Sequence, residues 1–232
     1  MKFLFIVLMM ASFAAHAQLK NESEVSTVRT SGNTKVQTYL FKTLSKYEVE
    51  KSTYTFGGHY TYGENRGELS ARDWDVNLKY EHTLTDRLSY YLGEIVEGYR
   101  FQGVKARYNS DAGLKYFFIK SDPKNFFSEL GYRYTIEDRY DLATSYENKA
   151  RAFLEWNHKT SETFQYRLWA EYVPNFTIDN DYLLTYEGSA TSIINSVFSL
   201  KVSYKTIRRN VPVSDEFKKE DNIFTTSLVA KF

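Results

Sequence analysis

His59 and Asp75 are the two residues whose types and spacing come nearest to an acid–base site. A carboxylate next to an imidazole can orient the ring as a general base. If residues 52–62 and 72–84 are neighbouring antiparallel strands, a constant sum of residue numbers (59 + 75 = 134) places the two side chains opposite each other on one face. No serine stands close by on that face, so the set of nucleophile, base and orienting group is incomplete. A polar contact is the favoured interpretation, and a lipid-hydrolysing enzyme is the less favoured one.

Charged residues form a second candidate, because two hairpin registers place acids opposite bases. A sum of 244 for the first three pairs and of 322 for the last two predicts Arg107 with Glu137, Asp111 with Arg133, Lys115 with Glu129, Glu155 with Arg167, and Arg151 with Glu171. Each cross-strand pair contributes roughly 0.2–1 kcal/mol. As a ladder, these charges would neutralise one another, fix the register and fill the interior. As a pore lining, they would select solutes by charge.

The same two registers place apolar residues together on the opposite face. Strands near 106–119 and 126–137 would bring Leu114 opposite Leu130 and Phe118 opposite Phe126. Strands near 146–158 and 163–173 would bring Trp156 opposite Tyr166. A sheet that is polar on one face and apolar on the other is typical of a membrane barrel with a polar interior.

The alternation of polar and apolar residues predicts twelve strands. They span about 22–30, 34–45, 52–62, 72–84, 88–100, 106–119, 126–137, 146–158, 163–173, 182–193, 197–207 and 222–232. A strand of about 9–11 residues crosses an outer membrane at a tilt. The predicted fold is therefore all-β: a transmembrane, antiparallel, up-and-down β-barrel of the outer-membrane type. Merging the two weakest segments, within 22–45, would reduce the count to ten.

The lengths of the connections predict the orientation of the barrel. Connections after the even-numbered strands are compact, such as residues 85–87 and 194–196. Those after the odd-numbered strands are mostly longer, from Gly63–Ala71 up to Arg208–Asp221, with the tight turn Ser31-Gly32-Asn33 as the exception. Short periplasmic turns and longer outer loops are the rule in bacterial barrels. We therefore expect both termini in the periplasm of a Gram-negative bacterium.

Both ends of the chain support an outer-membrane destination. Residues 1–17 combine a lysine, an apolar run and the site Ala15-His16-Ala17, which is typical of a cleavable secretory signal peptide. Residues 18–232 would then form the barrel. The last strand is apolar on one face and ends at Phe232, which we interpret as the terminal signal recognised by the barrel-assembly machinery.

Composition excludes several other classes of protein. The mean hydropathy of −0.51 is too polar for a helical membrane protein, although 17% of residues are aromatic. The chain has no cysteine, so disulfides and thiolate metal sites are excluded. The formal net charge of +1 gives no reason to expect a nucleic-acid partner. No motif predicts a metal or another cofactor.

An ordered set of short motifs resembles a known family. The motifs are Ser31-Gly32-Asn33-Thr34, Thr85-Asp86-Arg87-Leu88-Ser89-Tyr90, Arg107-Tyr108, Ala112-Gly113-Leu114-Lys115-Tyr116, Glu129-Leu130-Gly131-Tyr132, Tyr172-Val173-Pro174-Asn175, Ser203-Tyr204 and Asn210-Val211-Pro212. In this order they resemble the salt-induced outer-membrane proteins grouped as domain of unknown function 481. Lys115 stands where that family often has a glycine, and Glu94, Val96 and Gly98 fit its pattern loosely. The resemblance implies an outer-membrane barrel and supplies no catalytic residues.

Three functions are compatible with these observations. The first is a monomeric, porin-like barrel that forms a narrow, weakly selective channel for ions or small solutes, in contact with outer-membrane lipid. The second is a non-conducting barrel with a structural role in the envelope under osmotic stress. The third, a barrel enzyme acting on lipid, depends on His59 and Asp75 alone, and we predict no enzymatic activity.

Overall fold

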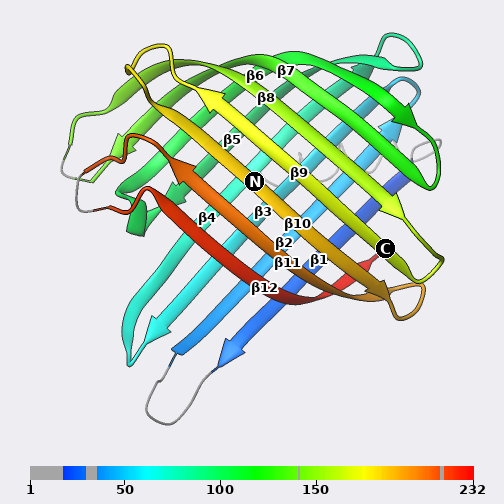
Figure 1. Ribbon diagram of the computed structural model, residues 1–232, viewed down its shortest axis with the longest axis horizontal. Coiled ribbons are helices and arrows are strands. Elements are labelled where there is room, and N and C mark those ends of the chain that lie inside the picture. Colours follow the sequence, from blue (N-terminus) through cyan, green and yellow to red (C-terminus); the bar gives the residue numbers. More distant parts are fainter. Residues whose placement is uncertain (1–17, 30–35, 141, 215–216) are drawn as a thin grey trace, which may run out of the picture.

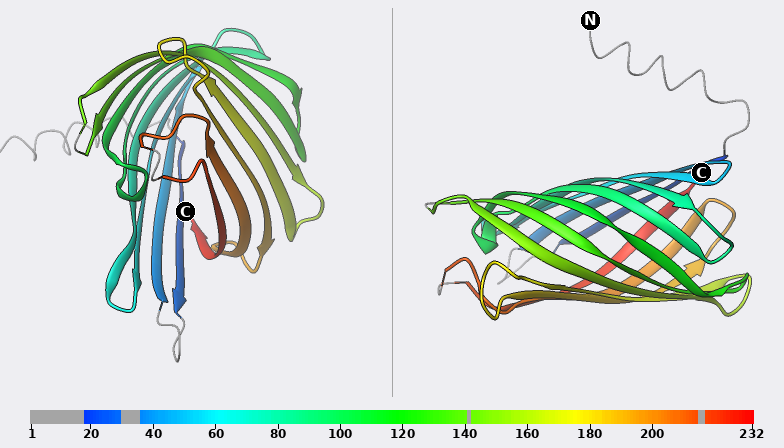
Figure 2. Two further views of the ribbon diagram at one scale, coloured as in Figure 1. Left: turned by 60° about the vertical axis from the view of Figure 1, so that its left-hand side comes forward. Right: turned by 90° about the horizontal axis from the view of Figure 1, so that it is seen from above.

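Twelve antiparallel strands close into one barrel in the computed structural model, which describes residues 18–29, 36–140, 142–214 and 217–232 (Figures 1 and 2). The elements are β1 Gln18–Arg29, β2 Val36–Val49, β3 Ser52–Asn65, β4 Glu68–Thr83, β5 Leu88–Tyr99, the 3₁₀ turn η1 Arg100–Gln102, β6 Val104–Lys120, β7 Lys124–Arg139, β8 Ser145–Lys159, β9 Phe164–Pro174, β10 Tyr182–Ile193, β11 Phe198–Arg209 and β12 Glu220–Lys231. The strand count of twelve is confirmed. None of the helical structure in the described ranges is long and apolar enough to span a membrane.

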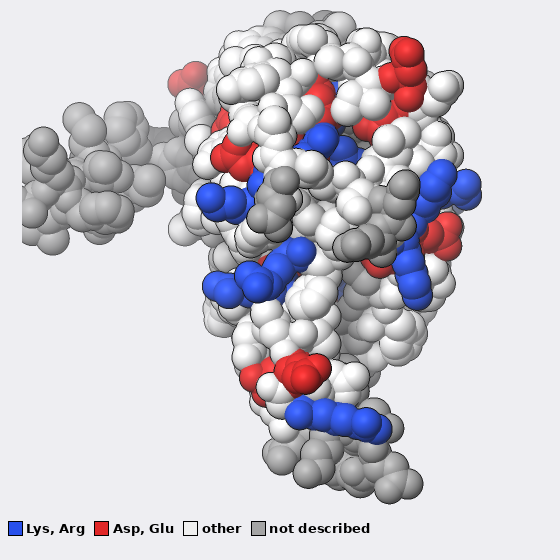
Figure 3. Space-filling view, turned by 90° about the vertical axis from the view of Figure 1, so that its left-hand side faces the viewer, with Lys and Arg blue, Asp and Glu red and all other residues white. Residues whose placement is uncertain are grey.

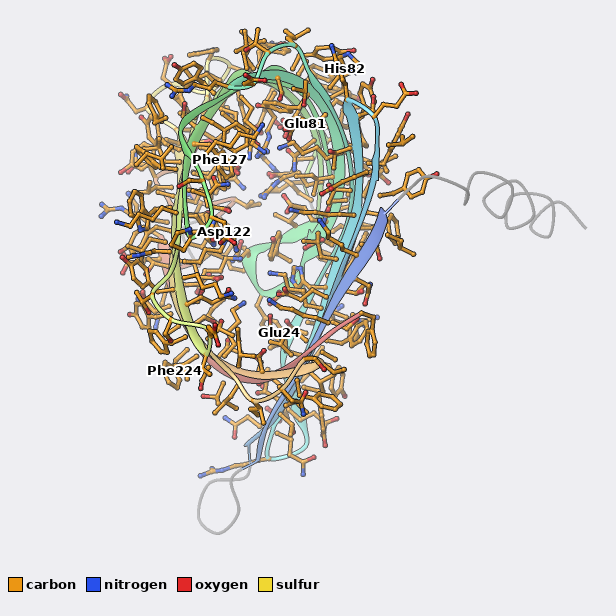
Figure 4. All side chains as sticks on the ribbon, turned by 90° about the vertical axis from the view of Figure 1, so that its right-hand side faces the viewer. Glu24, Glu81, His82, Asp122, Phe127 and Phe224 are labelled. Carbon is orange, nitrogen blue, oxygen red and sulfur yellow. The ribbon has the colours of Figure 1, made fainter. Side chains whose placement is uncertain are left out.

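The burial of side chains is the reverse of that in a water-soluble protein. Outward side chains are apolar and exposed, such as Leu130 at 63% and Phe224 at 67%, whereas the inward Glu137 is 0% exposed. Figure 4 shows Glu24, Glu81 and Phe127 pointing into the barrel, and His82 and Phe224 pointing away from it. An apolar exterior around a polar interior matches a barrel immersed in lipid.

One predicted loop was wrong. Residues Gly63–Ala71 do not form a long connection, because β3 continues to Asn65 and β4 begins at Glu68. Arg66 and Gly67 form a two-residue turn with φ angles of 54° and 87°. Positive φ at both central positions is the geometry of a tight type I′ hairpin, for which glycine at the second position is well suited. The turn Ser31-Gly32-Asn33 and the expected signal peptide, residues 1–17, lie outside the described residues.

The predicted register between β6 and β7 is confirmed over most of its length. Arg107 is opposite Glu137 and Asp111 is opposite Arg133, both with a sum of 244. A bulge at Phe118 shifts the register near the turn, so Ile119 is opposite Phe126. The rings of Phe118 and Phe126 nevertheless stack, with their centroids 4.9 Å apart. The bulge therefore changes the pairing of the backbones without separating the two rings.

The predicted register between β8 and β9 was wrong by two residues. The sum is 324, so Trp156 is opposite Leu168 rather than Tyr166. A shift of two residues keeps every side chain on the same face, so the polar–apolar pattern could not distinguish the two registers. The ion pair between Glu155 and Arg167 still forms as a diagonal contact.

The barrel closes at a short seam between its first and last strands. β1 pairs with β2 along its whole length, from Gln18 to Arg29, whereas its described pairing with β12 runs only from Glu22 to Val25. Two backbone hydrogen bonds extend the seam: Asn21 N donates to Phe232 O at 2.8 Å, and Phe232 N donates to Asn21 O at 2.9 Å. The ladder between β1 and β12 is therefore the least extensive in the described barrel.

Aromatic rings gather outside the barrel near the short turns. The ring centroids of Tyr54 and Tyr80 lie 5.2 Å apart, and those of Tyr80 and Tyr90 lie 6.0 Å apart. His82 joins this group, with its ring 5.5 Å from that of Tyr90. His158 Nδ1 lies 2.8 Å from Tyr166 Oη on another part of the same end. Both histidines therefore belong to aromatic clusters on the outer face of the barrel.

Candidate functional site

A central network of ion pairs lies in the lumen along the β4–β9 wall. Arg133 binds Asp111 through two hydrogen bonds of 2.7 Å and reaches Glu171 at 3.0 Å. Arg151 donates to Glu129 at 2.8 Å and to Glu171 at 3.1 Å. The predicted pairs Asp111–Arg133 and Arg151–Glu171 are therefore parts of one connected structure, and its groups are largely withdrawn from solvent.

Two residues that the hairpin registers did not include complete this central network. Lys79 on β4 forms an ion pair with Glu129 on β7. The Tyr91 hydroxyl on β5 accepts a hydrogen bond of 3.1 Å from Arg151 on β8. Each of these contacts passes over the strands between its partners. The bridging side chains therefore reduce the open cross-section along the β4–β9 wall.

A second network lies toward the longer loops, around Glu137. This carboxylate accepts hydrogen bonds from Arg107 at 2.6 Å, from Arg139 at 2.7 Å and from Arg209 at 3.1 Å. Arg209 belongs to β11, which is four strands from β7 in the closed sheet. The bond between Arg209 and Glu137 therefore spans the lumen, which no pairing of adjacent strands predicts.

The five predicted charge pairs have different outcomes. Four of them form ion pairs: Arg107–Glu137, Asp111–Arg133, Glu155–Arg167 and Arg151–Glu171. Lys115 is opposite Glu129 as predicted, but its Nζ bonds to Glu81 at 2.9 Å. Glu129 is already bound by Lys79 and Arg151. Lys115 also lies over the Phe127 ring, 4.3 Å from its centroid.

The opposite wall of the lumen carries shorter polar side chains. The inward residues on β10, β11, β12 and β1 include Ser189, Thr191, Ser199, Ser203, Ser227 and Ser26. This wall also carries charges: Lys201 Nζ lies between Glu24 and Glu187 and donates to Glu24 at 3.0 Å, and Ser227 Oγ donates to Glu24 at 2.6 Å. The lumen is thus lopsided: long, paired side chains occupy the β4–β9 wall and short ones line much of the other.

Inward aromatic residues form a row near the short turns. The ring centroids are 5.4 Å apart for Phe117 and Phe127, 5.9 Å for Phe127 and Phe153, and 5.9 Å for Phe153 and Trp169. The row crosses β6, β7, β8 and β9, the wall that also carries much of the central ion network. It further fills the same side of the barrel.

The mouth with the longer loops is crossed by the connection between β11 and β12. A Cβ atom on Gly103 would lie 2.7 Å from the Phe217 ring, which shows how closely this ring covers the β5–β6 connection. Gln102 Nε2 also donates to Asp221 Oδ2 at 2.8 Å. β5 and β11 are six positions apart in the ring of twelve, on opposite walls. Both connections lie at the left-hand end of Figure 1, and Figure 3 shows residues of both charges on that face.

His59 and Asp75 are opposite each other and hydrogen-bonded, as the sum of 134 predicts. Asn77 Nδ2 donates to the second carboxylate oxygen of Asp75 at 3.0 Å. No serine, threonine or tyrosine bonds to His59 in the described part of the chain. The pair has the acid–base orientation predicted for it, but it lacks a partner that could act as a nucleophile.

The substitution His59→Ala tests this pair directly. We expect the purified barrel to release fatty acid from phospholipid vesicles no faster than protein-free vesicles do, and the variant to behave identically. The measurement is fatty-acid release over time, with an active phospholipase added as the positive control. Hydrolysis by the native chain that His59→Ala abolishes would contradict this expectation.

The chain resembles other proteins through its family and its fold. A family model described as "Protein of unknown function, DUF481" matches residues 23–232. Among curated proteins, none matches the chain. The fold is similar to that of the NanC porin, with a TM-score of 0.52 and 12% identity over 92% of this chain and 98% of that one. It is also similar to an outer membrane channel from Pseudomonas putida F1, with a TM-score of 0.54 and 10% identity over 93% and 95% of the two chains.

Proposed function

Because this chain belongs to the DUF481 family of proteins of unknown function, and its closed barrel has an apolar exterior and a polar lumen, we propose that it is a narrow outer-membrane channel for ions or small hydrophilic solutes. The lopsided lumen carries this proposal. Paired side chains occupy the β4–β9 wall, while serine and threonine side chains line much of the opposite wall. A polar strip of this kind can hydrate a small solute without requiring a wide pore.

The orientation follows from the connections between the strands. Compact turns join β2 to β3, β4 to β5 and the later even–odd pairs, and we place them in the periplasm. The start of β1 and Phe232 lie at the same end as these turns, so they would be periplasmic too. The apolar outer face would contact the lipid of a Gram-negative outer membrane, and the last strand, which leads to Phe232, would be recognised by the barrel-assembly machinery.

Selectivity for charge is expected to be weak. The central network pairs Asp111, Glu129 and Glu171 with Lys79, Arg133 and Arg151, so its formal charge is zero. A strongly selective filter requires an excess of one sign along the path. We therefore expect a small preference between anions and cations.

Single-channel recording in planar bilayers tests the proposal. We expect steady, small openings from the refolded barrel of residues 18–232, with a reversal potential close to zero in a salt gradient. Each bilayer needs a parallel sample that shows the heat-modifiable migration of a folded barrel. Silence from a sample that passes this control would overturn the channel hypothesis.

The contacts across the mouth favour a second candidate, a closed barrel with a structural role during osmotic stress. Phe217 against Gly103 and the bond between Gln102 and Asp221 would both obstruct the path. The double variant Phe217→Ala, Gln102→Ala separates the two candidates. A closed barrel conducts only after these substitutions, whereas a narrow channel conducts before them and more strongly afterwards.

A further inference from the structure

The outer surface carries a carboxyl group where lipid is expected. Glu94 is the middle residue of the outward set on β5, which runs Tyr90, Leu92, Glu94, Val96 and Gly98. Its directly opposed residues are Leu78 on β4, which is 55% exposed, and Ser110 on β6, which is also exposed. Opposed residues share one face of a sheet, so Glu94 points outward with them.

The neighbouring strand places Glu94 at mid-height in the apolar band. The outward set of β4 runs from Trp74 to His82, with Leu78 at its centre and directly opposite Glu94. Aromatic side chains at both ends of such a set are typical of the two interfaces of a membrane. On the outward faces of the described strands, between these interfaces, Glu94 is the only Asp, Glu, Lys or Arg.

The hydrogen bonding of Glu94 within the barrel is incomplete. Ser110 Oγ donates to Glu94 Oε2 at 2.7 Å, and the other carboxyl oxygen has no partner in the described structure. Hydrocarbon supplies no hydrogen bonds, and an ionisable group there is costly unless it meets another polar group. The lumenal networks do not use this side chain, because it lies on the other face of the sheet. Its partner must therefore come from outside the barrel.

A second copy of the chain meets this requirement with the fewest assumptions. A two-fold axis along the membrane normal would bring Glu94 against Glu94 of the other copy at the same depth. A protonated carboxyl group carries both a donor and an acceptor, so two of them can form a reciprocal pair of hydrogen bonds. The neighbours Ser110 and Ala112 on β6 are small, which lets two surfaces approach closely.

We propose that the outer face of β5 and β6 around Glu94 is the contact surface of a symmetric dimer within the membrane. The sequence alone favoured a monomer, because only the register reveals that this carboxyl group faces lipid at mid-height. The dimer does not depend on conductance, so it can be tested whether or not the barrel is a channel.

Cysteine cross-linking tests the proposed face, since the chain has no native cysteine. Leu92→Cys is placed two residues from Glu94 on the outward face, and Leu168→Cys, on the outward face of β9, is the matched control. The full chain is expressed in a Gram-negative host, and intact outer membranes are treated with a short bismaleimide. We expect a cross-linked dimer as the main product with Leu92→Cys and only monomer with Leu168→Cys.

Substitutions at Glu94 test its role in that contact. Combined with Leu92→Cys, the change Glu94→Gln keeps a donor and an acceptor and should preserve the cross-link. Glu94→Leu should reduce it about tenfold, the change expected for losing one or two hydrogen bonds in a membrane. Heat-modifiable migration confirms that each variant is folded. Three results would overturn the proposal: equal cross-linking with Leu168→Cys, only monomer with Leu92→Cys, or a cross-link that Glu94→Leu leaves unchanged. A cross-link from Leu92→Cys to another protein would also overturn it, because this face would then bind a different partner.

Discussion

Replacing Glu137 with glutamine is expected to lower the free energy of unfolding by roughly 3–5 kcal/mol, the range seen when one member of a buried charge network is removed. Glu137 is fully buried and is bound by Arg107, Arg139 and Arg209. Glutamine has nearly the same shape but no charge, so three guanidinium groups would remain close together without their common counter-ion. The measurement is denaturant unfolding in lipid vesicles, followed by tryptophan fluorescence.

Glu155→Gln is the matched control for this prediction. Glu155 forms an ion pair with Arg167, whose side chain is 37% exposed. Water can therefore solvate the guanidinium once the carboxylate is gone, and we expect a loss of less than about 1 kcal/mol. If the two variants lose equal amounts of unfolding free energy, the three arginines around Glu137 stabilise the barrel no more than the single ion pair of Glu155 does.

Adding a single methyl group at Gly113 is expected to destabilise the barrel by about 1–3 kcal/mol. Gly113 and Gly131 face each other on β6 and β7, and the Tyr91 side chain covers both. A Cβ at position 113 would lie 2.4 Å from Leu130 O and 2.7 Å from Tyr91 Oη. The backbone oxygen cannot move without disturbing the strand ladder. The readout is the denaturant midpoint of Gly113→Ala in vesicles.

Gly93→Ala provides the comparison for this substitution. Gly93 is also an inward glycine in a central strand, but an added Cβ would meet no atom closer than 3.6 Å. We expect its free energy of unfolding to stay within about 0.5 kcal/mol of the native value, so that its denaturant midpoint hardly changes. If both alanine variants unfold at the same midpoint, the close approach at Gly113 does not limit the stability of the barrel.

Much of the fold could be predicted from the sequence because a barrel repeats one simple rule. Alternation of polar and apolar residues located the twelve strands, and the charges of Arg107, Asp111 and their partners identified the register of β6 and β7. The same reasoning failed between β8 and β9, because a shift of two residues preserves both faces. It also took Arg66-Gly67 as part of a long loop, although both residues accept the positive φ of a tight hairpin.

The organisation of the lumen was harder to predict, since hairpin sums relate only neighbouring strands. The contacts of Lys79 with Glu129 and of Arg209 with Glu137 join strands that are not adjacent. They depend on the curvature of the closed sheet and on the length of each side chain. The Arg208-Arg209 pair is visible in the sequence, but only the closed structure shows that Arg209 points across the barrel and supplies a third cation to Glu137.

The short seam between β1 and β12 has a consequence for the order in which the barrel comes apart. Each of the other strand pairs joins consecutive strands in the chain and is held by a longer ladder, whereas β1 and β12 are joined by hydrogen bonds over a few residues. Separating those two edges leaves a curled sheet in which all hairpin pairings are intact. The lowest-energy open form should thus be this sheet, with two free edges onto which another β-strand could add.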